Sequence, residues 1–452
     1  MKIALLGGGS LYFETVIAEL ASTPELAGSE VVLYDIDAKR MDMIYRVGLR
    51  IIIKTKAKMR LSATTSLPRA LDGANFAIAS IGVHGPKAGW HKLDSDVAAQ
   101  FGIIHTTGDT IGPSGLSQAL RIIPIFLQIA HAMEKYCPNA VLLNHSNPMG
   151  AICRAITKYT RIRVIGYCHN VAADLRFIAR VLQVEHTELE PVFAGPNHCV
   201  WMWGLKYRGR DVFPLLKRRL ASANKGRTGT PLPPRPDGTG KSLKGHWFAA
   251  DMLELFDVFL VGGDRHLIEF FPHARRATSS RRIPYKLQWR SDMIRDNQLQ
   301  AELNSSPAKM RLKAEGKAPV WLPDPKEPTP ENMGQQIRAL RYGPAMMHTL
   351  NIPNRGAVPN LPDWAVIELR AEIGLNGTRP LVVGDMPIQA ARWSLAHIYT
   401  HELTIAAAAE SSREKALMAM ATDPMIRDFD EARRVFDAIV KAQGARLKAF
   451  RA

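Results

Sequence analysis

A thiol and two imidazoles lie in positions from which they could bind a metal ion or move a proton. Cys168 and His169 follow an apolar strand, and His198 ends the short loop Gly195–His198. A thiolate and an imidazole on adjacent loops can hold a divalent metal and leave positions open for a substrate. A soft thiolate favours zinc or iron, but an isolated Cys and an isolated His are also common core and surface residues. These residues alone therefore leave the presence and identity of a metal open.

Two further polar loops carry groups that can act on a substrate. They contain several glycines together with Asp109 in one loop and Asp264, Arg265 and His266 in the other. Asp264 can serve as a general base, and Arg265 can bind a carboxylate through its planar guanidinium. A helix-capping aspartate beside a solvated arginine would give the same sequence pattern. Both interpretations stay open at this point.

A glycine-rich turn near the start of the chain has the form of a dinucleotide-binding motif. Gly7 permits a tight turn after a short apolar run, and Gly9 lets the backbone approach a pyrophosphate at the start of the next helix. Asp35 ends the following strand, where a carboxylate can bind ribose hydroxyls and repels the 2′-phosphate of NADP. Tyr12 occupies the third glycine position, so the turn could also serve packing alone. We predict NAD as the ligand. The residues predicted to bind it are Gly7, Gly9, Ser10, Asp35 and Asn144.

Strands and helices alternate through the region that carries these residues. Apolar runs predict strands over Lys2–Leu6, Glu30–Tyr34, Asn75–Ile81, Ala140–Leu143 and Arg163–Tyr167, with helices over Leu116–Tyr136 and Pro148–Tyr159. Such alternation predicts an α/β fold with a Rossmann-like, doubly wound parallel sheet that binds ligands beyond the carboxyl ends of its strands.

The pattern changes near residue 195 to strands without regular crossovers, followed by long helices at 389–409 and 428–447. We therefore predict an NAD-binding domain over residues 1–195. An α+β domain for substrate, metal and oligomerisation is expected over 196–452, in the arrangement of lactate and malate dehydrogenases. Residues 224–240, rich in Gly, Pro and Thr, indicate a mobile loop that can act as a lid.

Composition excludes several classes of protein. The chain has 452 residues, of which 46% are hydrophobic and 22% charged, as in globular proteins, and its four Cys are too few for a disulfide scaffold. The net charge of +17 suits nucleic acid or anionic small molecules, but no nucleic-acid-binding motif is present. No apolar run is long enough to cross a membrane, and the early glycines leave no room for a signal peptide. We expect a cytoplasmic enzyme of small molecules, with neither nucleic acid nor membrane as a partner.

The motifs taken together resemble glycoside hydrolase family 4 over nearly the whole chain. The matching segments are Gly7–Ser10, Asn144–Met149, Cys168–Val171, Asn197–His198, Asn351–Gly356 and Asn360–Pro362. The resemblance implies NAD⁺ and a divalent metal, usually Mn²⁺, with Cys168 and His198 as the metal ligands. It also implies redox-assisted elimination, in which the sugar is oxidised at C3, deprotonated at C2, cleaved at the C1–O bond, hydrated and reduced again.

The residue after the cysteine tracks the substrate class in this family. Phospho-α-glucosidases have Asp there and phospho-β-glucosidases have Asn, whereas enzymes for unphosphorylated glycosides have His, as His169 here. The other polar loops are similar to those of the α-galacturonidase branch, although Asn170 replaces the Glu of that branch. On this resemblance, His169 protonates the leaving oxygen and Asp264 replaces the tyrosine base of the phosphoglycosidases. The residues expected to contact the sugar are Asn147, Asp109, His266 and Arg265, the last through the uronate carboxylate.

Several alternatives accompany this hypothesis. Within the family they are an α-glucuronidase, an α-galactosidase or an α-glucosidase. Outside it, a 2-hydroxy acid dehydrogenase shares the predicted fold, and a basic, cofactor-sensing binding protein would not turn over any substrate. The family resemblance also implies a homodimer or homotetramer that acts on a small oligosaccharide or uronide.

Overall fold

Six parallel strands form the first half of a long sheet in the computed structural model. The strands are β1 (Lys2–Leu6), β2 (Glu30–Tyr34), β3 (Arg60–Thr64), β4 (Phe76–Ala79), β5 (Val141–Asn144) and β6 (Arg163–Gly166). Their order, β3-β2-β1-β4-β5-β6, is that of a dinucleotide-binding sheet, which confirms the predicted Rossmann-like fold. The sequence did not reveal β3, because this edge strand contains Arg60, Ser62 and Thr64 and no apolar run.

The structure describes residues 1–84, 88–225, 246–272, 285, 287–295, 307–325 and 328–451. The predicted lid over 224–240 lies outside these residues, apart from the backbone of its first two positions at the end of a helix.

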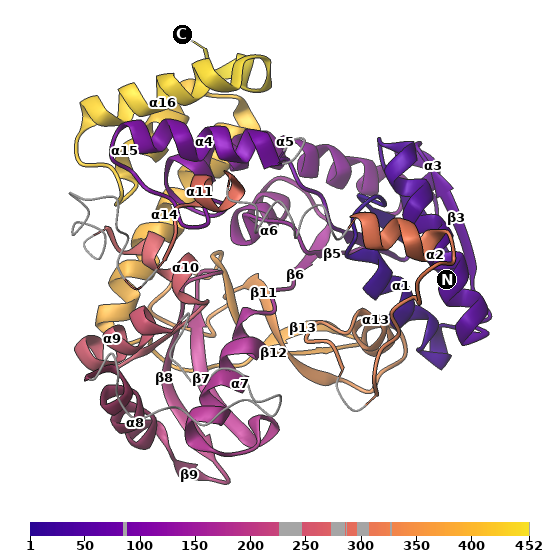
Figure 1. Cartoon of the computed structure of the whole chain (residues 1–452), viewed down its shortest axis with the longest axis horizontal. Helices are drawn as coiled ribbons and strands as arrows, with labels where there is room; N and C mark the ends of the chain where they lie inside the picture. The colour runs from indigo at the N-terminus through magenta and orange to yellow at the C-terminus, as the bar shows by residue number, and fades with distance from the viewer. Residues whose placement is uncertain are drawn as a thin grey trace.

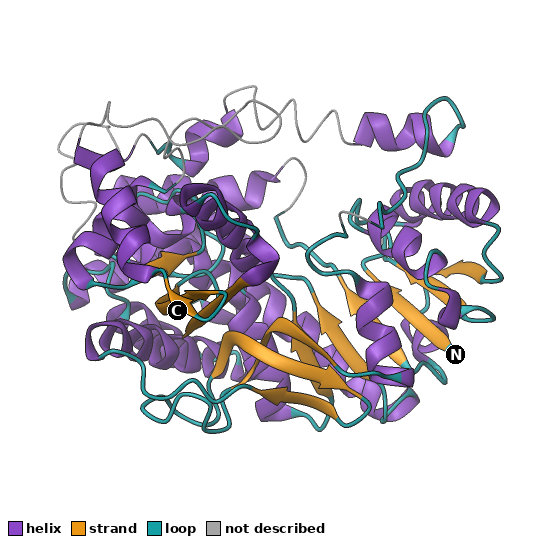
Figure 2. Ribbon diagram, turned by 90° about the horizontal axis from the view of Figure 1, so that it is seen from below, coloured by secondary structure: helices purple, strands orange, loops and turns teal. Residues whose placement is uncertain are grey.

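Helices cover both faces of the parallel strands (Figures 1 and 2). They are α1 (Phe13–Ala21), α2 (Ala38–Thr55), α3 (Leu67–Leu71), α4 (Gly89–Gln100), α5 (Gly112–Tyr136), α6 (Met149–Tyr159) and α7 (Asn170–Leu182). Helix α5 has the length and apolar composition of a membrane span, but 72% of its most apolar window is buried inside the protein. Such burial is typical of the core helix that the sequence predicted here.

The second half of the chain extends the same sheet with antiparallel strands. These are β7 (Leu189–Gly195), β8 (Val200–Tyr207), β9 (Arg210–Asp211), β10 (Phe259–Val261), β11 (Met346–Pro353), β12 (Val366–Gly374) and β13 (Gly377–Pro380). Strand β11 joins the two halves, since Asn351 pairs with Gly166 of β6. The predicted domain boundary at residue 195 falls at the end of β7, and the sheet continues across it. The division into two domains stays a prediction.

Helices also surround the antiparallel half. They are α8 (Phe213–Lys225), α9 (Trp247–Phe256), α10 (Asp264–Leu267), α11 (Arg290–Arg295), α13 (Met333–Tyr342), α14 (Ile388–Glu410), α15 (Arg413–Thr422) and α16 (Phe429–Gln443). The last helix is shorter than the predicted 428–447, because Gly444 adopts a φ of 58° and a 3₁₀ segment follows. In Figure 1 the last helices lie beside α4 and α5, so the end of the chain packs on the first half.

A buried carboxyl group links the helix after the glycine turn to the second half of the chain. Glu19 of α1 accepts a hydrogen bond from the backbone N–H of Met333 at 2.7 Å, and the hydroxyl of Thr329 donates to its other oxygen. Burial raises the pKa of Glu19 to about 7, although both hydrogen bonds favour the ionised form. The fold is therefore more stable when the Glu19 carboxyl group is protonated than when it is ionised.

Glu19→Gln should remove a pH-dependent part of the stability. The pKa of Glu19 is about 7 in the folded protein and near 4.5 in the unfolded chain. Its contribution to the free energy of unfolding is therefore complete below the unfolded pKa. This contribution is lost as the pH rises through the folded pKa, which lowers the free energy of unfolding by up to about 3 kcal/mol. As the pH rises from about 5 to about 8, we expect the melting temperature of the wild type to fall more than that of Glu19→Gln. Glu25→Gln, at an exposed position, is the matched control. Parallel curves for all three proteins would contradict the assignment.

Candidate functional site

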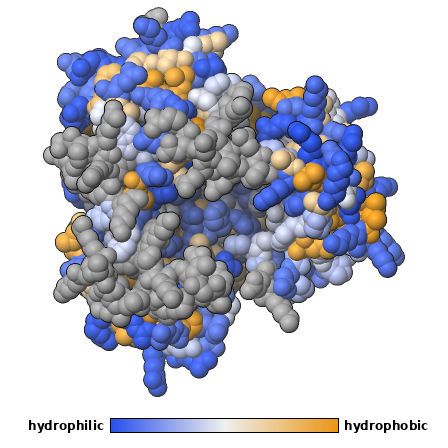
Figure 3. Space-filling view, in the orientation of Figure 1, coloured by the Kyte–Doolittle hydropathy of each residue, from blue (hydrophilic) through white to orange (hydrophobic). Residues whose placement is uncertain are grey.

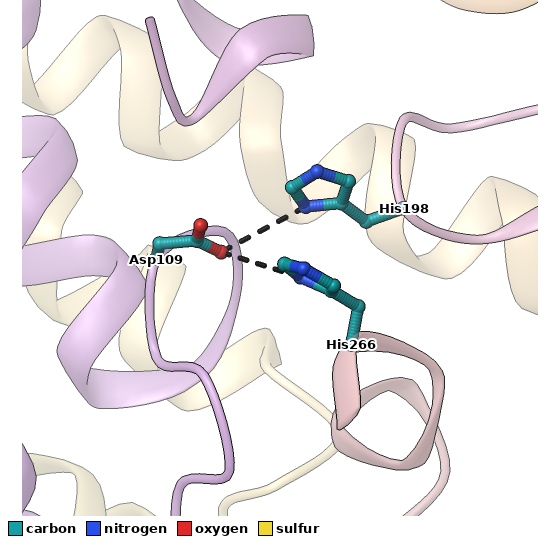
Figure 4. Close-up of side chains that lie close together, drawn as sticks. All are labelled: Asp109, His198 and His266. Carbon is teal, nitrogen blue, oxygen red and sulfur yellow. Dashed lines mark ion pairs between the residues drawn. The ribbon is translucent and has the colours of Figure 1, made fainter. Parts of the chain in front are cut away.

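Asp109, His198 and His266 come together from three separate segments of the chain (Figure 4). Asp109 lies just before α5, His198 lies in the turn between β7 and β8, and His266 lies on α10. The Nδ1 atom of each imidazole is 3.7 Å from Oδ1 of Asp109, and ligand atoms of all three residues lie within 4.8 Å of one another. One carboxylate and two imidazoles are a donor set that fits a divalent metal ion.

The turn that carries His198 fixes the direction of its imidazole. His198 adopts a left-handed backbone conformation with a φ of 69°. The Thr110 hydroxyl donates to Asp109 Oδ1 at 2.7 Å and lies 2.8 Å from His198 Nδ1. The Thr110 hydroxyl therefore bridges the carboxylate and the imidazole and holds Nδ1 of His198 on the side of the ring that faces Asp109.

The electrostatics of the group match what a metal requires of its ligands. Burial raises the pKa of Asp109, but His266, His198 and the Thr110 hydroxyl outweigh it and hold this pKa well below its usual range. Burial lowers the pKa of His198 to about 3 and also lowers that of His266. An ionised carboxylate therefore faces two neutral imidazoles, which are the protonation states that coordinate a cation.

Glu269 fixes the loop that carries Asp109. Its Oε1 atom accepts hydrogen bonds from three successive backbone N–H groups, those of Thr106 at 2.7 Å, Thr107 at 2.8 Å and Gly108 at 3.0 Å. These bonds and the adjacent His105 overcome burial and lower the pKa of Glu269 to about 2. Glu269 follows His266 by three residues, so one short segment both carries His266 and holds the loop of Asp109. Glu269 was not predicted as a functional residue, although it stands out in the sequence as a single acid within an apolar run.

Asn147, Cys168 and His169 lie at the carboxyl ends of β5 and β6. Asn147 Nδ2 donates to Asp109 Oδ2 at 3.2 Å, and its buried Oδ1 has no hydrogen-bond partner among the described residues. Cys168 is not part of the three-residue group, and burial followed by the charge of Glu368 raises the pKa of its thiol. Its role as a metal ligand stays a prediction.

His169 presents an accessible imidazole. Its side chain is 67% exposed, and Nδ1 lies 3.6 Å from Oε1 of Glu331. The interaction with Glu331 raises the pKa of His169, whereas burial opposes it. The protonated imidazole is therefore favoured more strongly than in a free histidine, as suits an acid for a leaving group.

The two residues that precede His266 have different surroundings. Asp264 is 1% exposed, and its two carboxylate oxygens accept hydrogen bonds from the N–H groups of Phe248 at 3.0 Å and Ala249 at 3.1 Å in the first turn of α9. This geometry favours a helix-stabilising role over that of a general base, although burial raises the pKa of Asp264 to about 6. Arg265 donates from Nη2 to the backbone oxygen of Thr106 at 3.0 Å and so borders the loop of Asp109.

The glycine turn forms a cradle without side chains. A Cβ atom on Gly7 would lie 2.3 Å from the backbone oxygen of Ser80, and one on Gly9 would lie 2.7 Å from Cβ of Arg40. The N–H of Gly9 donates to Asp35 Oδ2 at 2.8 Å, so the predicted ribose-binding carboxylate is already joined to the turn. Only glycine fits these positions, which agrees with a phosphate group that approaches the backbone.

The other two predicted cofactor-binding residues flank this turn. Ser10 Oγ lies 2.9 Å from Ser80 Oγ. Asn144 is completely buried. Its side-chain Oδ1 accepts a hydrogen bond from the backbone N–H of Ser146 at 2.9 Å, and its Nδ2 donates to the backbone oxygen of Ser146 at 3.1 Å. Asn144 therefore shapes the loop after β5, and its direct contact with a cofactor stays a prediction.

The face of the molecule seen in Figure 3 is hollowed near its centre, and the visible floor of this hollow is mainly hydrophilic. Such a surface suits a polar ligand such as a sugar.

Comparisons with known proteins define the family. The description "Family 4 glycosyl hydrolase" matches residues 2–184, and "Family 4 glycosyl hydrolase C-terminal domain" matches residues 193–426. The chain therefore belongs to family 4 of the glycosyl hydrolases and is a glycosidase, as the sequence motifs predicted.

Three relatives illustrate the range of the family. An alpha-galacturonidase of Thermoanaerobacterium saccharolyticum is 28% identical, with 98% of this chain and 95% of that protein covered. An alpha-galactosidase of Bacillus subtilis is 27% identical, with 94% and 93% covered. A 6-phospho-alpha-glucosidase from gut microorganisms, solved in complex with NAD and Mn²⁺, shares the fold with a TM-score of 0.81 at 23% identity, and 98% of each chain is covered.

Asp109→Asn should weaken the binding of Mn²⁺ at least about tenfold, because the amide keeps the size of the side chain but removes the charge between the two imidazoles. Isothermal titration with Mn²⁺ would measure the change. Asp42→Asn on α2, whose carboxylate pairs with Arg46 at the surface, is the control. Equal affinities in the wild type and in Asp109→Asn would show that the three-residue group does not bind the ion.

Proposed function

We propose that this glycosidase hydrolyses unphosphorylated α-galacturonides with NAD⁺ and a divalent metal ion, Mn²⁺ in the first instance. The observation that carries the substrate class is the position of Arg265, whose guanidinium borders the loop of Asp109 and whose charge helps to lower the pKa of His266. A guanidinium beside a sugar site attracts a carboxylate more strongly than a neutral hydroxymethyl group, because it can form charge-assisted, bidentate hydrogen bonds to a carboxylate. The likeness to an alpha-galacturonidase over nearly the whole chain supports the same class.

The donor sets described above fit both cofactors. The glycine cradle and Asp35 would hold the pyrophosphate and the adenosine ribose of NAD⁺, while Asp109, His198 and His266 would hold the metal, with Cys168 as a further candidate ligand. When bound, these groups supply reversible oxidation of the sugar at C3 and stabilisation of negative charge on its oxygens.

The side chains of the protein then orient the sugar and move protons. Asn147 keeps an unpaired Oδ1 for a sugar hydroxyl and is fixed by its bond to Asp109. His169, whose pKa is raised by Glu331, donates a proton to the leaving oxygen. Arg265 binds the carboxylate at C6. We leave the base that removes the C2 proton unassigned, because both oxygens of Asp264 are bound to backbone N–H groups.

The chemistry can be tested with digalacturonate as the substrate. We expect hydrolysis that requires NAD⁺ and Mn²⁺, stops after chelation and leaves no stoichiometric NADH, because the redox step is reversed in each turnover. In D₂O the released sugar should carry deuterium at C2. Full activity without cofactor and metal would overturn the proposal, and stoichiometric NADH would instead favour the 2-hydroxy acid dehydrogenase.

A specific rival is an α-galactosidase, since one relative with that name is 27% identical. Aryl α-galactosides and aryl α-galacturonides with the same leaving group separate the two activities. A higher kcat/KM for the neutral sugar would favour the rival.

Gly9→Ala should lower the affinity for NAD⁺ by at least about tenfold, because the added methyl group would displace Arg40 and press on the Asp35 carboxylate. Fluorescence titration with NADH measures the effect. Gly89→Ala is the matched control, since a Cβ at that position meets no atom within 4 Å. If the two variants bind NADH equally well, the cofactor lies elsewhere.

A further inference from the structure

Arg290 is fixed beside the loop of Asp109, although it is remote in sequence. Its backbone N–H donates to the backbone oxygen of His105 at 2.7 Å. The preceding Trp289 packs against a small apolar cluster formed by Ile104 and Ile268. The same contacts therefore hold the start of α11 against the loop that leads to Asp109 and against the segment that carries Glu269.

One nitrogen of the Arg290 guanidinium is an unsatisfied donor, although the side chain as a whole is only partly buried. Its Nε atom is buried and has no hydrogen-bond partner, and the side chain forms no ion pair with any described residue. A buried donor without a partner is destabilising, and a ligand that accepts its hydrogen bond removes this penalty.

The acids near Arg290 are already engaged by other groups. Oε1 of Glu269 receives the N–H groups of Thr106, Thr107 and Gly108, and Asp109 faces His198 and His266. Neither carboxylate forms an ion pair with an arginine among the described residues. The two described acids that act on Arg290 therefore already have other partners.

A second positive charge lies close to the first. Burial lowers the pKa of Arg290, and Arg265 is the next cause in the same direction, while Asp109 and Glu269 act against them. Arg290 also contributes to lowering the pKa of His266 and of His84. The two guanidinium groups therefore lie close enough to act on each other electrostatically, and an anionic ligand beside them would be attracted by both.

We propose that Arg290, together with Arg265, binds the carboxylate of the uronide and is the residue that selects an acidic over a neutral sugar. This inference rests on the proposed function and adds a second, sequence-distant residue to it. A carboxylate attached directly at C5 of the ring is short and planar, so it suits two planar guanidinium groups. A sugar 6-phosphate has related charge chemistry, and the experiment separates the two anions.

The test compares kcat/KM of aryl α-galacturonide and aryl α-galactoside in the wild type, Arg290→Gln and Arg290→Lys. We expect Arg290→Gln to lose between about tenfold and about a hundredfold on the uronide, as for a lost charge-assisted hydrogen bond, and less than about threefold on the galactoside. Arg290→Lys should recover part of the uronide activity, since it restores the charge but not the planar fork. Arg161→Gln, whose side chain is 94% exposed, is the control. Equal losses on both sugars would overturn the inference.

A binding measurement separates failure of this inference from failure of the proposed function. Isothermal titration of the NAD⁺- and Mn²⁺-loaded protein with galacturonate, galactose and galactose 6-phosphate needs no turnover. Preference of the wild type for galacturonate, lost in Arg290→Gln with unchanged melting temperature, supports the inference even if no glycoside is cleaved. Preference for galactose 6-phosphate, or galacturonate binding that Arg290→Gln leaves unchanged, contradicts it even if uronides are hydrolysed.

Discussion

The interaction on which the site depends is the placement of one ionised carboxylate between two neutral imidazoles. Asp109 keeps its charge in a buried position because His198, His266 and the Thr110 hydroxyl surround it. The imidazoles lose their protons because the same burial disfavours a positive charge. The arrangement needs a third component, the carboxylate of Glu269, which holds the Asp109 loop through three backbone N–H groups. Burial and charge thus prepare a cation site from residues that are far apart in sequence.

The continuous sheet explains how these residues meet. The parallel strands end at the glycine turn, at Asn147 and at Cys168, whereas the antiparallel strands β7, β8 and β10 carry the turns of His198 and His266. Strand β11 connects the two sets, so their loops belong to one continuous sheet. In the proposed reaction, a cofactor held by the first set and a metal held by the second would act on the same sugar.

Much of this fold could be predicted from the sequence, and less of the site. Five of the six parallel strands were visible as apolar runs, and Glu30–Tyr34 was predicted with its correct bounds, whereas the edge strand β3 was not predicted. The family followed from motifs near Gly7, Asn147 and Cys168, because local spacing encodes them. The convergence of Asp109 and His266 on His198 was not predicted, since it depends on contacts between loops more than 60 residues apart. For the same reason the sequence could not distinguish a base from a helix-stabilising carboxylate at Asp264, and the structure favours the second.

The glycine turn also has a thermodynamic consequence. The amides of Gly7 and Gly8 are bonded to the Tyr34 carbonyl at 2.9 and 2.7 Å, and Asp35 joins the N–H of Gly9 to that of Asp37. A loop that is ordered before its ligand arrives pays little conformational entropy on association. More of the intrinsic contact energy is then retained as affinity, so a coenzyme that must stay bound through repeated catalytic cycles can dissociate slowly.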